Sequence, residues 1–199
     1  MAQPLPGDVG LIDEPAAGKA WVGSWHVVGQ LRVLVIGSGG REHALSLALS
    51  RDPAVLELHA APGNPGTALL GANHFVDPLD GRAVADLAIQ LGVNLVVVGP
   101  EAPLVAGVAD AVRANGVPCF GPSAAAAQLE GSKAFAKAFM RRHGIPTSAC
   151  LETDSLEEAL HAARSGRFGF PLVIKADGLA AGKGVVIAPN LEEAETAIR

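Results

Sequence analysis

Two lysines and a run of small residues near the end of the sequence have the composition of a phosphate-binding loop. Lys175 ends an apolar run that starts at Leu172, and Lys183 lies among glycines just before a second apolar run. Glycines let backbone N–H groups approach a polyphosphate closely, and each charged hydrogen bond to phosphate contributes roughly 1.5–3 kcal/mol. The pattern predicts a strand, a phosphate-binding loop and a second strand. A glycine-rich hairpin with a solvated lysine is the alternative interpretation.

A second glycine-rich turn follows the apolar run 31–36 and precedes a helical pattern. It consists of Gly37, Ser38, Gly39, Gly40, Arg41, Glu42 and His43. A strand, a glycine turn and a helix can bind phosphate at the helix N-terminus. The dinucleotide fingerprint needs a third glycine where this sequence has Glu42, so a nicotinamide cofactor is disfavoured. A smaller phosphate, with Arg41 as a second contact, and a plain strand–helix turn both remain open.

Two further loops follow predicted strands at the ends where open α/β sheets bind their ligands. The first contains Asn64 and Gly66, and the second contains Gly99, Pro100 and Glu101. A carboxylate at position 101 could accept hydrogen bonds from sugar hydroxyls or from an amine. The alternatives are a tight turn at the first loop and, at the second, an acid that favours the next helix N-terminus.

Alternating strand and helix patterns fill residues 31–129 and predict the fold class. Right-handed crossovers turn such an alternation into a doubly wound parallel sheet. Within it we expect a short strand at residues 74–76 and one helix around residues 105–112. Later elements are expected to be helices from Lys133, over 156–163 and over 191–199, with strands near 147–151 and on both sides of Lys183. The prediction is an α/β sheet domain followed by an incomplete α+β module.

Composition excludes several classes of function. The 199 residues carry a net charge of -5 and only 18% charged residues, which argues against the basic face that a nucleic-acid-binding protein needs. The two cysteines and six histidines show no zinc-ligand spacing. No apolar run approaches the roughly 20 residues of a membrane span, and no secretory signal is recognisable. We therefore expect a cytoplasmic protein without a nucleic-acid or membrane partner.

The first thirty residues differ from the rest in having no arginine and no sustained hydrophobic period. This pattern predicts a poorly ordered extension over residues 1–30. The composition changes again after the alanine-rich stretch that ends near Leu129. The predicted organisation is thus an extension over 1–30, a sheet domain over 31–130 and a second domain over 131–199.

In this order the motifs resemble those of the phosphoribosylamine–glycine ligase family, also called glycinamide ribonucleotide synthetases, of the ATP-grasp superfamily. The resemblance is carried by the stretches 33–44, 62–67, 99–104, 128–133 and 174–184. Five motifs in the same order over residues 31–187 are specific, whereas none of them alone would be.

The resemblance implies an ATP-dependent ligation in de novo purine biosynthesis. Glycine would be activated as glycyl phosphate and then attacked by the amine of 5-phosphoribosylamine. The sheet domain would be a pre-ATP-grasp domain that holds the sugar phosphate with residues 37–43, Asn64, Gly66 and the loop 99–101. Lys133 and Lys175 would bind the phosphates of ATP, and Gly182, Lys183 and Gly184 would belong to the loop that closes over them.

The sequence departs from this family in one respect. The family's magnesium ligands lie further downstream, so Mg²⁺ is an expected cofactor without a metal site in this chain, and no catalytic residue is assigned. We therefore expect the 199-residue chain to be a fragment that does not turn over alone. The alternatives are a truncated, non-catalytic binding module for nucleotides or sugar phosphates, another ATP-grasp ligase, and a Rossmann dehydrogenase that would bind NAD.

Overall fold

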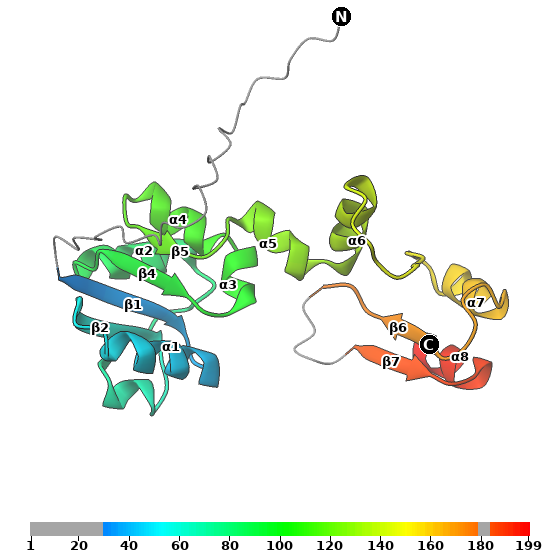
Figure 1. Cartoon of the computed structure of the whole chain (residues 1–199), viewed down its shortest axis with the longest axis horizontal. Helices are drawn as coiled ribbons and strands as arrows, with labels where there is room; N and C mark the ends of the chain where they lie inside the picture. The colour runs from blue at the N-terminus through cyan, green and yellow to red at the C-terminus, as the bar shows by residue number, and fades with distance from the viewer. Residues whose placement is uncertain (1–29, 179–183) are drawn as a thin grey trace, which may run out of the picture.

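The computed structural model describes residues 30–178 and 184–199 and contains a parallel sheet followed by a smaller antiparallel one (Figure 1). The parallel sheet has five strands in the order β3-β2-β1-β4-β5. Its strands are β1 (Leu31–Gly37), β2 (Val55–Pro62), β3 (Ala72–Asn73), β4 (Leu95–Val98) and β5 (Cys119–Phe120). The prediction of a doubly wound α/β sheet is confirmed. The extension predicted over residues 1–30 falls, except for Gln30, outside the described residues.

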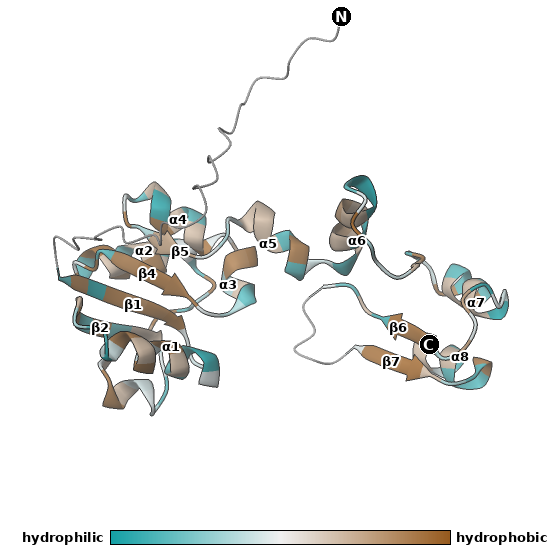
Figure 2. Ribbon diagram, viewed as in Figure 1, coloured by the Kyte–Doolittle hydropathy of each residue, from teal (hydrophilic) through white to brown (hydrophobic). Residues whose placement is uncertain are grey.

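Helices cover both faces of the parallel sheet. On one face α1 (Gly40–Ser50) packs on Val33 and Val35, and on the other α2 (Gly81–Gln90) and α4 (Val108–Ala114) pack on Leu34 and Ile36. Because both faces are covered, residues 33–36 of β1 are all fully buried, as the continuous apolar run requires. The central strands are accordingly among the most hydrophobic parts of the ribbon (Figure 2).

Two elements of the sheet domain differ from the prediction. The expected helix around residues 105–112 is two helices, α3 (Glu101–Val105) and α4, because Gly107 between them has φ +86° and breaks the helical path. The short strand expected at residues 74–76 lies earlier, at β3. A 3₁₀ turn, η1 (Thr67–Leu69), leads into it.

The second part of the chain is a two-stranded antiparallel sheet with helices. It follows α5 (Ala124–Gly131), whose Ala127 belongs to the core of the parallel-sheet part, and comprises α6 (Lys133–Arg142), α7 (Leu156–Arg164), β6 (Leu172–Lys175), β7 (Val185–Ala188) and α8 (Leu191–Ile198). A small core of Ala163, Ala188 and Ala194 joins α7, β7 and α8. The expected helices and the strand pair are present.

The strand predicted near residues 147–151 is wrong. Among the described residues this segment has no strand partner, and it instead lies along α6, where the Lys137 amine donates to Thr147 Oγ1 at 2.7 Å and to Ser148 O at 2.7 Å. Side chains of the helix thus replace the ladder that a strand would need. Within the described residues, no helix combines the length and the apolar character needed to cross a membrane.

Candidate functional site

Three loops meet at the carboxyl ends of β1, β2 and β4. The parallel register places Gly37 beside Pro62. Gly63 N donates to Gly37 O at 3.1 Å, and Gly99 N donates to Ile36 O at 3.0 Å. The turn after β1 is therefore the middle of the site, with the other two loops on either side of it.

Asn64 ties the loop after β2 to the turn after β1. Its Nδ2 donates to the carbonyls of Ser38 and Gly39, both at 3.1 Å, while its Oδ1 accepts from the N–H groups of Gly66 and Thr67. A Cβ on Gly66 would come within 2.5 Å of the His43 ring. These contacts explain why position 64 is an asparagine and position 66 is a glycine.

The start of α1 offers backbone donors to an anion. Gly39 is the N-cap, and its N–H is satisfied by Glu42 Oε2 at 2.7 Å. The next N–H groups of an α-helix have no partner within the helix, and the space beside Gly40 is open, because a Cβ there would meet no other described part of the chain within 4 Å apart from its own neighbours and helix backbone. An exposed helix start of this kind binds a phosphate group well.

A charged chain joins this turn to the loop after β4. Arg41 Nε donates to Glu42 Oε1 at 3.0 Å, and Arg41 Nη2 donates to Glu101 Oε2 at 3.0 Å. The two carboxylates raise the pKa of Arg41. Hydrogen bonding to its own backbone N–H and to Arg41 lowers the pKa of Glu101. Glu101 therefore stays ionised at neutral pH, and its side chain is 37% exposed.

The residues predicted to bind the sugar phosphate thus lie at one edge of the sheet. Within that edge they differ in exposure: Arg41 is exposed, His43 is half-buried and Glu42 is buried. Pro100 precedes α3 in an extended conformation and Glu101 opens that helix.

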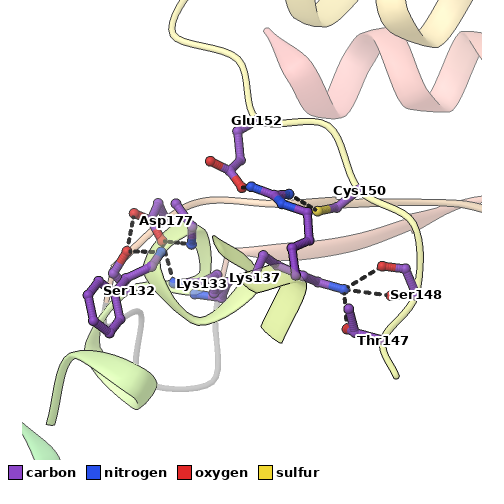
Figure 3. A network of polar contacts seen from close by, with 11 residues as sticks. Ser132, Lys133, Lys137, Thr147, Ser148, Cys150, Glu152 and Asp177 are labelled. Carbon is purple, nitrogen blue, oxygen red and sulfur yellow. Dashed lines mark hydrogen bonds and ion pairs between the residues drawn. The ribbon is translucent and has the colours of Figure 1, made fainter. Parts of the chain in front are cut away.

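A second polar cluster lies where β6 ends and α6 begins (Figure 3). The Asp177 carboxylate accepts from the N–H of Lys133 at 2.6 Å, from the N–H of Ala134 at 3.2 Å and from the Ser132 hydroxyl at 2.9 Å. Lys133 Nζ donates to Gly178 O at 2.7 Å. A carboxylate from the chain itself thus occupies the anion-binding start of α6, and the lysine side chain is the group left to reach a phosphate.

The other residues predicted to bind ATP lie on the strand pair or beyond the described part. Lys175 is exposed at the end of β6, opposite Val185 of β7. Gly184 has φ +74°, and its carbonyl accepts from Ala176 N at 2.9 Å. Gly182 and Lys183 lie outside the described residues. Among residues 30–178 and 184–199, no group of three or more His, Cys, Asp or Glu is arranged to hold a metal ion.

Sequence reasoning missed Asp177 and Lys137. Asp177 is 44 residues from Lys133 in the sequence, and nothing in its neighbourhood indicates that it caps a distant helix. The signal for Lys137 is its position four residues after Lys133, on the same side of α6.

Two protein families match adjacent parts of the chain, which together span residues 31–199. A family described as "Phosphoribosylglycinamide synthetase, N domain" matches residues 31–130, and "Phosphoribosylglycinamide synthetase, ATP-grasp (A) domain" matches residues 131–199.

Individual relatives agree with these matches. The phosphoribosylamine–glycine ligase of Streptomyces coelicolor is 58% identical over 167 residues, covering 82% of this chain and 39% of that protein. Its counterpart in Pseudomonas aeruginosa is 54% identical and covers 85% of this chain and 39% of that protein. The crystal structure of the Thermotoga maritima phosphoribosylamine–glycine ligase superposes with a TM-score of 0.66 at 36% identity, covering 83% of this chain and 38% of that one. The chain thus spans about 39% of the length of the curated relatives.

Proposed function

The chain belongs to the phosphoribosylglycinamide synthetase family, and from this membership we propose that it forms part of a cytoplasmic ligase that joins glycine to 5-phosphoribosylamine. In this reaction ATP phosphorylates the glycine carboxylate, which gives glycyl phosphate and ADP. The amine of 5-phosphoribosylamine then attacks the acyl carbon, loses a proton and displaces phosphate. The product is glycinamide ribonucleotide, an intermediate of de novo purine biosynthesis.

We assign the two ligands to different parts of the chain. Residues 31–130 would hold the sugar phosphate, and residues 131–199 would contribute to the ATP site. The observation that carries the proposal is the junction of three loops at one sheet edge, made by the bonds of Asn64 and by the pair of Arg41 with Glu101.

That sheet edge offers backbone donors at one place and a carboxylate at another, so it suits a ligand that carries both an anion and hydrogen-bond donors. The N-terminus of α1, at Gly40, would bind the 5-phosphate through backbone N–H groups and the helix dipole. Glu101, ionised and partly exposed, would accept from the ribose hydroxyls or from the amine. A phosphorylated sugar with a free amine carries the two complementary kinds of group.

On the second part of the chain, Lys133 and Lys175 would bind the phosphates of ATP, together with Gly182, Lys183 and Gly184. Lys133 would exchange its bond to the Gly178 carbonyl for one to a phosphate oxygen. Mg²⁺ would neutralise phosphate charge when bound. Residues 30–178 and 184–199 include no cluster of side chains suited to hold it.

Calorimetric titration of the chain with ribose 5-phosphate, ATP and NAD tests this proposal. We expect ribose 5-phosphate and ATP to bind without competing, and unphosphorylated ribose to bind far more weakly than ribose 5-phosphate. NAD that competes with ribose 5-phosphate would instead indicate a dinucleotide site and overturn the proposal. Lys133→Met should weaken the binding of ATP and leave the affinity for ribose 5-phosphate unchanged.

A further inference from the structure

Glu42 lies in the middle of the proposed sugar-phosphate site and yet is closed off from solvent. The residue is only 3% exposed, and both carboxylate oxygens already have partners within the turn. Oε2 accepts from Gly39 N at 2.7 Å, and Oε1 accepts from Arg41 Nε at 3.0 Å. Because the side chain is buried, a ligand atom has no space through which to reach it.

The same side chain fills the space between two of the three loops. A Cβ added to Gly37 would lie 2.6 Å from Glu42 Cγ, and a Cβ on Gly99 would lie close against Glu42 Oε1. Gly37 also has φ +128°, where a side chain would be strained. The two glycines thus leave room for a buried carboxylate, and the turn after β1 and the loop after β4 close around it.

Arg41 connects the buried Glu42 carboxylate to the partly exposed Glu101 carboxylate. Its guanidinium is held between the buried carboxylate of Glu42 and the partly exposed carboxylate of Glu101. A guanidinium bonded on two sides to carboxylates is oriented by both of them, because its donors lie in a rigid plane. Moving or neutralising Glu42 would therefore release Arg41 and, with it, Glu101.

We propose that Glu42 is a positioning residue for the sugar-phosphate site, which aligns the Glu101 carboxylate through Arg41 without contacting the ligand. The inference rests on the proposed function, since it takes the Glu101 side of the site to bind the sugar. It predicts that Glu42 and Glu101 act as one unit in ligand affinity.

The test is a double-mutant cycle of Glu42→Gln and Glu101→Gln, read as calorimetric affinity for ribose 5-phosphate. The glutamine amide keeps the volume of Glu42 but turns an N–H donor toward either Gly39 N or Arg41 Nε. We expect each single variant to bind about tenfold more weakly, which is the loss of one charged hydrogen bond. In the Glu101→Gln background, Glu42→Gln should change the affinity less than twofold.

A matched control is Glu57→Gln. Glu57 is also a glutamate paired with an arginine, Arg32, but at the opposite end of the strands from the site. This variant should bind ribose 5-phosphate like the wild type. If Glu42→Gln does not fold, Glu42→Asp replaces it in the cycle, because the shorter side chain keeps the charge but draws it back from Arg41 Nε, and it must likewise be non-additive with Glu101→Gln.

A pH profile of affinity adds a readout that a purely structural role would not move. The Arg41 guanidinium helps to hold the pKa of the Glu101 carboxyl below its usual value of 4.5 in the wild type. The inflection that Glu101 causes in the pH profile should therefore move up toward pH 4.5 in Glu42→Gln. If the wild type fails to bind ribose 5-phosphate, the proposed function falls and this inference falls with it. If the wild type binds and the two substitutions add independently, only the inference is overturned.

Discussion

Two carboxylates, Glu42 and Asp177, accept hydrogen bonds at helix starts and at the same time join two loops. Glu42 accepts from the N–H of Gly39, the residue before α1, whereas Asp177 accepts from the first N–H groups of α6, at Lys133 and Ala134. Glu42 belongs to the helix that it caps, whereas Asp177 reaches α6 from the far end of β6. A cap of either kind removes donors that the helix cannot satisfy itself. At both places the chain uses a charged group where a neutral one would make the same bonds more weakly.

Replacing Asp177 by asparagine should destabilise the start of α6. The Ser132 hydroxyl, followed by N–H groups at the start of α6, lowers the pKa of Asp177 below its ordinary value of 3.8. Loss of the charged cap should reduce the free energy of unfolding by about 1 kcal/mol, measured by urea denaturation at pH 7. Asp86→Asn, which alters an exposed acid paired only at 3.9 Å with Arg82, is the control.

The sign of the pH dependence follows from that lowered pKa. The carboxylate contributes fully above pH 3.8, its value when unfolded, and the contribution is lost as the pH falls through the lower folded pKa. The difference between wild type and Asp177→Asn should therefore shrink in acid. A difference that is the same at all pH values would contradict a role for the charge.

His59 should make the sheet domain sensitive to mild acid. Burial lowers the pKa of His59 below 6.5, although Glu57 opposes this. Its Nδ1 lies 3.0 Å from His74 Nε2, and its Nε2 lies 3.4 Å from Glu57 Oε1. Because the folded pKa is the lower one, stability present above pH 6.5 is lost as the pH falls toward the folded pKa, by up to about 1.4 kcal/mol per pH unit.

Urea denaturation between pH 7 and pH 5 measures this effect. His59→Gln should flatten that part of the stability profile, whereas the exposed His161→Gln should leave it as in the wild type. A slope that survives in His59→Gln would assign the acid sensitivity to another group.

At the scale of elements, α6 organises the second part of the chain through one row of cations. Lys133, Lys137 and Arg141 recur every four residues. Lys133 binds the loop after β6, whereas Lys137 and Arg141 both bind the segment 147–152. Lys133 donates to Gly178 O, Lys137 to the hydroxyls of Thr147 and Ser148, and Arg141 to Cys150 and Glu152 (Figure 3). The helix therefore replaces the strand pairing that residues 147–151 lack.

Lys137→Met should loosen the contact between α6 and residues 147–148. The methionine keeps the apolar stem but removes three hydrogen bonds to exposed acceptors, so the cost is modest, about 1 kcal/mol. Hydrogen exchange should rise in the segment that follows α6, around residues 145–152, and remain unchanged in β1. Arg142→Met, a loss of charge at a neighbouring exposed position, is the control, and equal exchange in both variants would contradict the assignment.

Helix starts and buried strands could be predicted from the sequence because their signals are local. Ser123 and Ser132 cap α5 and α6 as serine before a helical pattern indicates, and the apolar run of β1 is buried as its length and branching require. The break at Gly107 was not predictable in the same way, since a glycine inside a helical pattern can be tolerated.

The site was predictable only to the level of its loops. Strand order brings the loops of Gly37, Asn64 and Glu101 to one edge, and parallel topology alone implies this. Which side chain is buried depends on how the loops close, so Glu42 could not be distinguished from Arg41 by sequence. Asp177 and Lys133 meet only through tertiary folding.

For the whole molecule, the proposed sugar-phosphate and ATP sites lie on different parts of one chain. The parallel sheet gathers backbone donors and one ionised carboxylate at its edge, and α5 and α6 lead from this sheet to the antiparallel strand pair that carries Lys175 (Figure 1). Binding at the two places should therefore be independent in this chain, which spans about 39% of the length of its curated relatives.

We propose above all that the phosphate of the sugar binds at the start of α1. An NMR titration of the ¹⁵N-labelled chain with ribose 5-phosphate tests it most directly. We predict that the amide resonances of Gly40 and Arg41 and the side-chain amide of Asn64 shift together and saturate with one affinity, while those of Lys133 and Ala134 stay in place. Shifts confined to residues 131–178, with Gly40 and Arg41 unmoved, would contradict the claim.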